Sequence, residues 1–116
     1  MTKRDYRLFI EDILESMSMI GEYIEDMDYH HFLVDRKTID AVIRNLEIIG
    51  EAARNIPEEI RNVYPAVPWK KMIGLRNIAI HAYFGIDLEI VWRIVSTNIP
   101  DAKTEITKLL DSFHDL

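Results

Sequence analysis

The sequence has no cysteine, which excludes a disulfide scaffold and a zinc site built on thiolates. Glycine and proline are scarce, with four residues of each, so there is little room for the tight turns of an all-β protein. No uninterrupted apolar run approaches the ~18 residues of a transmembrane helix. The first residues, MTKRDYRLFIEDI, contain no apolar signal core. We therefore expect a cytoplasmic protein with no membrane partner.

Basic residues are outnumbered by acidic ones, and the formal net charge is −6. Taken alone, this charge argues against a nucleic-acid-binding protein, and no DNA partner is expected. The charge is uneven, however: between Glu59 and Asp87 there is no acidic residue, and this window carries +4 while the rest of the chain carries −10. A local anion site and a chance fluctuation in a short window both fit this distribution. The basic residues of the window are Arg61, Lys70, Lys71 and Arg76.

The composition of the 116-residue chain, 48% hydrophobic and 29% charged, is that of a globular protein, and the length suits one domain. Apolar residues recur three and four apart, as on one face of an α-helix. No segment reads as a strand and no internal repeat is visible. We therefore expect a single all-α domain over residues 1–116, a bundle of four to five helices with short connections.

The apolar spacing, together with residues that begin and end helices, places five helices. The first two cover about 3–27 and 36–55, and the segment DMDYHHFLVD between them is expected to be a connection. A short helical turn is expected to begin at Pro57. The third helix begins at Pro68 and runs to His81 or Tyr83, and Gly85 is its C-terminal stop. Asp87 caps a fourth helix, and Pro100 opens a fifth.

The second expected helix carries an apolar stripe that should face the core. Gly50 lies inside this helical pattern, as Gly74 does in the third, and neither has the surroundings of a phosphate-binding loop. We expect these glycines either to let two helices approach closely or simply to cost some stability. The stripe comprises Ile39, Val42, Ile43, Leu46, Ile49 and Ala53.

Two stripes of side chains border each other on the third expected helix, taken at about 100° per residue. The long side chain of Arg76 can lean across toward His81, so the polar groups of both stripes could converge on one small ligand. Ile73 and Ala79, on the opposite side, are available for packing. One stripe comprises Trp69, Arg76, Ile80 and Tyr83, and the other Lys70, Asn77 and His81.

These residue types suit a phosphate in RNA. Arg76 presents a planar fork of donors with a permanent charge, and His81 can take or give a proton near neutral pH. Asn77 adds a neutral donor and acceptor, and Tyr83 can stack on a base or donate a hydrogen bond. Such a group could help a ribose 2′-hydroxyl attack its neighbouring phosphate without a metal ion, which is RNA cleavage of the cyclising kind.

Each of these residues also has an ordinary structural interpretation. A histidine near a helix end favours the helix dipole, a lone arginine often makes a weak exposed ion pair, and a tyrosine near a helix end is often an amphipathic rim residue. No two histidines have the i, i+4 spacing of a helical metal pair, so neither a metal nor a cofactor is expected.

The segment RNIAIHAY matches the R-x-x-x-x-H-x-Y form of the HEPN motif. Its surroundings, PWKKMIGLRNIAIHAYFGID, resemble the HepT-like subgroup of that superfamily, and so does AVIRNLEIIGEAARNIP in the second expected helix. The resemblance extends from about Lys3 to the fifth expected helix. It implies a HEPN-like homodimer in which the motif helices of two chains face one cleft.

The resemblance further implies a metal-independent endoribonuclease, the toxin of a type VII-like toxin–antitoxin pair. The antitoxin would be a minimal nucleotidyltransferase that transfers AMP to the motif tyrosine. Carried over, Arg76 and His81 are the catalytic pair, Asn77 is the polar position after the arginine, and Tyr83 is the modified residue. Ala82 stands where relatives frequently have a polar or acidic residue, which could alter the local charge seen by RNA or by the partner.

Lys70, beside the motif, is a candidate RNA-binding residue. Two rivals to the enzyme stay open. The first is a non-catalytic module that binds RNA or a nucleotide in the same cleft and partners a nucleotidyltransferase. The second is a purely structural helical partner of another protein. Substituting His81 separates the enzyme from the first rival, because cleavage should vanish with binding largely kept if the protein is the enzyme. The second rival predicts no affinity for RNA even at low salt.

Overall fold

The computed structural model describes residues 3–113, with side chains from Tyr6 onward, and this part of the chain is helical without a strand. None of its helices is both long enough and apolar enough to cross a membrane. The elements are α1 (Lys3–Tyr23), α2 (Tyr29–Val34), α3 (Arg36–Arg54), α4 (Glu58–Val63), α5 (Trp69–Ile73), α6 (Leu75–Tyr83), α7 (Leu88–Arg93), the π-helical segment η1 (Ile94–Asn98) and α8 (Ile99–Ser112).

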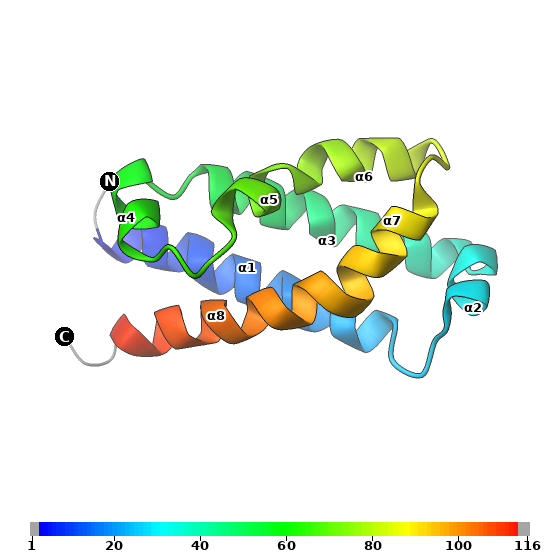
Figure 1. Cartoon of the computed structure of the whole chain (residues 1–116), viewed down its shortest axis with the longest axis horizontal. Helices are drawn as coiled ribbons and strands as arrows, with labels where there is room; N and C mark the ends of the chain where they lie inside the picture. Colours follow the sequence, from blue (N-terminus) through cyan, green and yellow to red (C-terminus); the bar gives the residue numbers. More distant parts are fainter. Residues whose placement is uncertain (1–2, 114–116) are drawn as a thin grey trace.

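The long helices α1 and α3 pack against each other and form the centre of the bundle (Figure 1). Helices α5 and α6 lie along α3, and α8 lies along α1. Helix α7 crosses from the end of α6 to α8, while α4 and α2 lie at opposite ends (Figure 1). The all-α bundle expected from the sequence is therefore confirmed.

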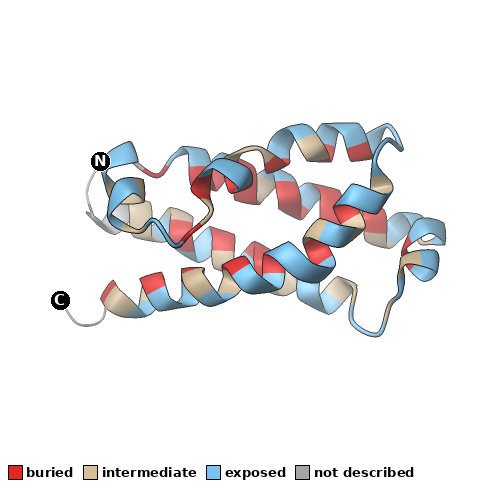
Figure 2. Cartoon of the chain, in the orientation of Figure 1, coloured by how far each residue is buried: buried red, intermediate tan, exposed pale blue. Residues whose placement is uncertain are grey.

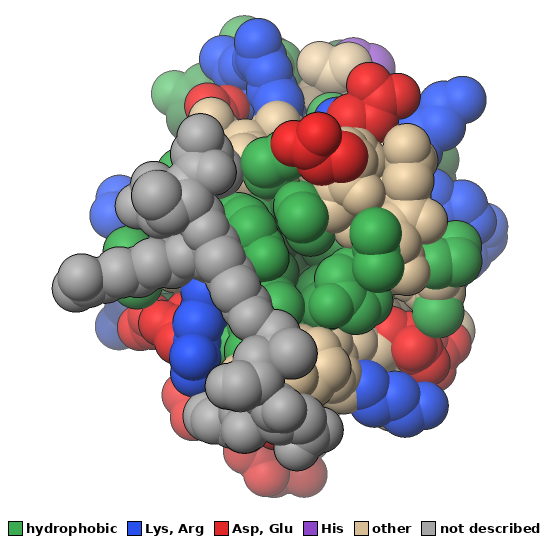
Figure 3. All heavy atoms as spheres, turned by 90° about the vertical axis from the view of Figure 1, so that its left-hand side faces the viewer, with side chains coloured by type: hydrophobic (Ala, Val, Ile, Leu, Met, Phe, Trp, Pro, Cys, Tyr) green, Lys and Arg blue, Asp and Glu red, His purple; other side chains and the backbone are tan. Residues whose placement is uncertain are grey.

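The buried residues lie on the inward faces of the helices (Figure 2). All six residues of the stripe expected on α3 are buried, which confirms the three-and-four spacing as the face toward the core. Burying an isoleucine such as Ile49 contributes about 1.5–3 kcal/mol relative to leaving it exposed. At the end of the bundle that carries α4, hydrophobic side chains also gather on the surface, with charged side chains around them (Figure 3).

The connection expected between the first two helices contains a helix of its own. Helix α1 ends at Tyr23 rather than near Met27, and Asp26 has a positive φ of 62°. The carboxylate of Asp28 then accepts a hydrogen bond from the His31 backbone N–H at 2.9 Å and caps α2. Phe32 of α2 is fully buried. Six residues are too few to show a helical period in the sequence, which is why the pattern did not predict α2. The burial of Phe32 in the core stabilises this short helix.

The third expected helix is interrupted at Gly74, where ψ is −12°, and becomes the two helices α5 and α6. A single helix from Pro68 to Tyr83 was therefore wrong. Glycine lowers the cost of leaving a helix because it has no Cβ and a low helix propensity. As a consequence, Lys70 lies on α5, whereas Asn77 and His81 lie on α6.

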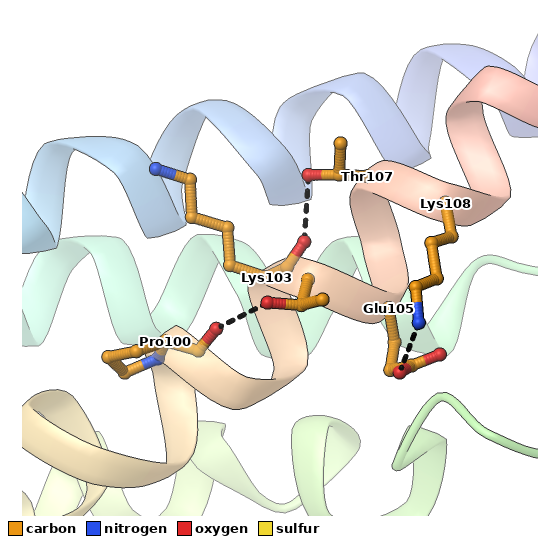
Figure 4. Close-up of polar contacts among 6 residues, drawn as sticks. Pro100, Lys103, Glu105, Thr107 and Lys108 are labelled. Atoms are coloured by element: carbon orange, nitrogen blue, oxygen red, sulfur yellow. Dashed lines mark hydrogen bonds and ion pairs between the residues drawn. The ribbon is translucent and has the colours of Figure 1, made fainter.

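The fourth and fifth expected helices form one continuous helical segment, from Leu88 to Ser112. Helix α8 begins at Ile99 with Pro100 in its first turn, as expected, but it follows the π-helical η1 without a break in the helical segment. Proline has no N–H to bond the carbonyl four residues earlier and its ring crowds that carbonyl, and a widened π turn accommodates both effects. On α8, the Thr107 hydroxyl donates to the Lys103 carbonyl at 2.8 Å (Figure 4), so this hydroxyl has its hydrogen-bond partner within its own helix.

Candidate active site

The motif helix α6 approaches α3 closely at Gly50. A Cβ atom built on Gly50 would lie 3.0 Å from the backbone nitrogen of Arg76, so no larger residue fits without displacing α6. The expectation that Gly50 lets two helices approach closely is thus confirmed. On the side of α6 that faces the core, Leu75, Ala79 and Ala82 are buried.

A Schellman motif ends α6 at the expected glycine. Gly85 has a φ of +77°, its N–H donates to the Ala82 carbonyl at 2.9 Å, and the Ile86 N–H donates to the His81 carbonyl at 2.9 Å. The C-terminal stop at Gly85 is confirmed. The turn folds the chain back along the last turn of α6, so the residue after Ile86 returns to the side chain of His81.

That residue is Asp87, whose role differs from the expected one. It precedes α7 at the N-cap position, but its side chain makes no cap hydrogen bond and its backbone is left-handed, with φ 58° and ψ 35°. Its Oδ2 atom lies 3.7 Å from Nδ1 of His81 instead. The His81 side chain is 59% exposed and can reach a ligand from solvent. An aspartate directly before a helix indicates a cap, and nothing in the sequence indicated a partner of His81.

Arg76 has a different partner. Its Nη1 atom lies 3.8 Å from Oε2 of Glu51 on α3, and both side chains are 56% exposed. An exposed pair of this kind is worth about 0–1 kcal/mol, so a phosphate can displace Glu51 at little cost. No pattern in the sequence linked Glu51 to Arg76.

The structure does not bring Arg76 and His81 into contact within one chain. Five residues along a helix correspond to about 140° of rotation, and in the described part of the chain no hydrogen bond or ion pair joins the two side chains. Exposed Ile80 lies between their directions on α6. The expected convergence of the polar side chains on one ligand is therefore not formed by direct contact in a single chain.

Tyr83 ends α6 and is 63% exposed, and its ring lies edge-to-face against Phe84, at 5.3 Å between ring centres. Its carbonyl accepts a hydrogen bond from Nη2 of Arg36 at 3.5 Å, a contact across 47 residues that the sequence could not indicate. Arg36 also pairs with Asp40 at 3.0 Å. A second guanidinium thus lies at the end of the motif helix.

The other two candidate residues are exposed and lie on different helices. The side chain of Asn77 is open to solvent on α6, and its backbone N–H bonds the Gly74 carbonyl. Lys70 on α5 borders an open cavity of about 740 Å³ that also contacts Arg61 and Lys71. Within residues 3–113, no group of three or more histidine, aspartate and glutamate side chains is placed to hold a metal ion.

Large apolar side chains are exposed around the motif. They lie on the outer side of α6, in the turn that follows it, and at the start of α7. We call this group the apolar motif surface: Ile80, Tyr83, Phe84, Ile86 and Ile90. Clustered apolar exposure of this kind is typical of an interaction surface.

Comparison with known proteins gives one family and several relatives. The family described as "Ribonuclease HepT-like" matches residues 13–109. "Putative RNase MJ0127" of Methanocaldococcus jannaschii is 50% identical over 110 residues, which is 95% of this chain and 91% of that protein. "Probable ribonuclease HepT" of Thermococcus cleftensis is 43% identical over 107 residues, 92% of this chain and 97% of that protein. No solved structure matches the chain.

Proposed function

The chain belongs to the Ribonuclease HepT-like family, in the HEPN superfamily, and we propose that it is an endoribonuclease that cleaves RNA without a metal ion. The observation that carries this proposal is the placement of Arg76 and His81 on either side of the exposed face of α6. Both side chains are more than half exposed, and each has only a weak partner. The helix itself is held by buried packing on α3 and by the turn at Gly85.

In the proposed reaction, His81 takes the proton from a ribose 2′-hydroxyl, whose oxygen attacks the adjacent phosphorus. The bond from phosphorus to the 5′-oxygen of the next nucleotide breaks, and the leaving oxygen takes a proton from a general acid. The guanidinium of Arg76 neutralises the charge that develops on the phosphate oxygens. The products are a 2′,3′-cyclic phosphate and a free 5′-hydroxyl.

This reaction moves two protons, whereas one chain supplies one motif histidine. We infer that two chains form a homodimer about a two-fold axis at α6, which doubles both His81 and Arg76. Ile80 supports this arrangement because it lies between the two polar side chains and is 45% exposed. Packing Ile80 against its copy would bring one chain's Arg76 toward the other chain's His81.

The dimer is tested by the mass of the purified protein in solution. Light scattering at micromolar concentration should give twice the chain mass, and Ile80→Glu should give the monomer because it places a charge in the contact. Val63→Glu is the matched control, since Val63 is 65% exposed on α4, away from the end of the bundle where Arg36 contacts Tyr83 (Figure 1). A strict monomer for the wild-type protein would overturn the two-histidine mechanism.

We further propose that the protein is the toxin of a type VII-like pair with a minimal nucleotidyltransferase antitoxin, which transfers AMP to Tyr83. The exposure of the Tyr83 phenol supports this, because a transferase needs access to the oxygen. Neighbouring positive charge also favours an added phosphate: Arg76 lies on nearly the same side of α6, and Arg36 contacts the Tyr83 carbonyl.

RNA cleavage itself is tested with purified protein, labelled RNA and EDTA. Wild type should cleave with the chelator present, and His81→Ala should lose about 10²–10⁴-fold in rate while still binding RNA. His30→Ala is the control, because His30 is exposed on α2 and outside the motif. Restoration of a lost activity by a divalent ion would contradict the metal-free mechanism. RNA binding without any cleavage by wild type would favour the non-catalytic module, which the separation of Arg76 and His81 in one chain also fits.

A further inference from the structure

The backbone conformation of Asp87 keeps its side chain from capping the N-terminus of α7. An aspartate at a helix N-cap normally has an extended backbone and accepts a hydrogen bond from the second or third N–H of the helix. Here the backbone is left-handed, with φ 58°, and the carboxylate caps nothing. The carbonyl of Asp87 still accepts the first hydrogen bond of α7, from the Val91 N–H at 3.1 Å. The start of α7 therefore uses the backbone of Asp87 and leaves the carboxylate available.

The same left-handed residue lies directly after the turn that anchors His81. The Ile86 N–H bonds the His81 carbonyl at 2.9 Å, and the next residue points its Oδ2 at the Nδ1 of the same histidine, 3.7 Å away. That distance exceeds a direct hydrogen bond, but both side chains are half exposed or more, and such contacts often tighten only when a substrate is bound. A left-handed aspartate costs conformational energy, although aspartate tolerates this region better than most residues.

We propose that Asp87 is a positioning residue for His81. Its carboxylate accepts the Nδ1–H of the imidazole and so leaves Nε2, on the far side of the ring, as the atom that exchanges protons with RNA. This inference rests on the proposed ribonuclease function for its consequence and on geometry alone for the contact. Fixing the tautomer matters because a neutral imidazole protonated at Nε2 would present a donor, and not a base, to the ribose hydroxyl.

The contact is tested without reference to activity by ¹⁵N NMR of the His81 imidazole in its neutral form. Wild type should show the Nδ1–H tautomer in excess, and Asp87→Gly should shift the population toward Nε2–H. Glycine adopts a left-handed backbone freely, so this variant removes the carboxylate and keeps the turn. Glu89→Gln is the matched control, because Glu89 is a neighbouring exposed carboxylate in the first turn of α7. An unchanged tautomer ratio in Asp87→Gly would overturn the proposal.

Kinetics then tests the consequence. Asp87→Gly should lower kcat by about tenfold or more, less than the loss expected when the imidazole is removed, and should leave KM near its wild-type value. Asp87→Asn should restore part of kcat, since its amide oxygen can accept the same hydrogen bond and asparagine tolerates the left-handed region. If wild type cleaves RNA and Asp87→Gly cleaves equally well, the positioning role is wrong and the ribonuclease function stands. If wild type does not cleave, the function is wrong and the NMR result still decides the contact.

Discussion

Gly50 of α3 lies directly against Arg76 of α6. A Cβ atom on Gly50 would be 3.0 Å from the Arg76 backbone nitrogen and 3.3 Å from the Arg76 Cβ. Both neighbours are parts of the chain that cannot rotate away. The two helices can therefore lie this close only because residue 50 has no side chain beyond a hydrogen atom. The same spacing sets the position of the Arg76 guanidinium beside Glu51.

Gly50→Ala should destabilise the protein and weaken RNA cleavage. The added methyl group overpacks the contact at a cost of about 1–3 kcal/mol, and the better helix propensity of alanine returns about 1 kcal/mol of this. Urea unfolding measures the net loss. Gly21→Ala is the control: this exposed glycine of α1 has open space where the Cβ would be, so the change should stabilise the protein by about 0.5–1 kcal/mol. If both changes stabilised the protein equally, α3 and α6 would be able to move apart at Gly50 without a loss of stability.

Arg76→Lys should lower kcat/KM for RNA although the charge is kept. An ammonium group cannot reproduce the paired donors of a guanidinium on a phosphate, and losing one charged hydrogen bond costs about 1.5–3 kcal/mol, or roughly ten- to a hundredfold in rate. Arg54→Lys, at an exposed position near the end of α3, is the control. Initial rates across RNA concentrations check the prediction. A wild-type rate for Arg76→Lys would leave Arg76 only a general electrostatic role.

The long helices were predictable because many of their apolar residues recur at the same spacing of three and four. The stripe on α3 repeats over 19 residues, and each of its members is buried. The six-residue α2 and the break at Gly74 escaped the same reasoning, since short segments carry little periodic signal and depend on tertiary contacts such as that of Phe32 with Trp92. The π segment before Pro100 shows the same limit: proline signalled an irregularity, but a helix beginning and a helix continuing through a wide turn have similar sequences.

The motif was predictable on α6, and its partners were not. Arg76, His81 and Tyr83 follow from local spacing along one helix. Glu51 and Arg36 reach that helix from α3 through packing, and nothing in their own surroundings in the sequence marks them. Asp87 was identified for the wrong reason, because the rule for N-caps assumes an extended backbone and this residue is left-handed.

Acid should weaken the start of α3. A hydrogen bond from the Thr38 backbone N–H to the Asp35 carboxylate lowers the pKa of Asp35 below its ordinary value. Because the pKa is lower in the folded state, the stabilisation is fully present above the unfolded pKa of about 4 and is lost as the pH falls through the folded value. Urea unfolding at pH 7 and pH 3 should therefore show a smaller drop for Asp35→Asn than for wild type. Asp12→Asn, an exposed change within α1, is the control and should leave the drop at its wild-type size.

Tyr83→Phe should keep the fold and most of the nuclease activity while escaping modification. The phenol makes no hydrogen bond to the described residues, and its ring contact with Phe84 survives the loss of the oxygen. Seven residues separate it from Arg76, which corresponds to about 10 Å along α6 on nearly the same side. AMP on the Tyr83 oxygen would place a phosphate near the guanidinium groups of Arg76 and Arg36. The phosphate would bind one of these guanidinium groups and would repel the phosphates of an incoming RNA.

The measurement is intact mass after co-expression with a minimal nucleotidyltransferase and ATP. Wild type should gain one or more AMP units and lose RNA cleavage together, and Tyr83→Phe should gain none and continue to cleave. Tyr29→Phe is the control, because Tyr29 lies on α2 outside the motif, and it should be modified like wild type. Suppression of toxicity with an unchanged wild-type mass would mean that the antitoxin acts by binding alone. AMP found on another residue, with Tyr83→Phe still inactivated, would place the regulatory site elsewhere in the chain.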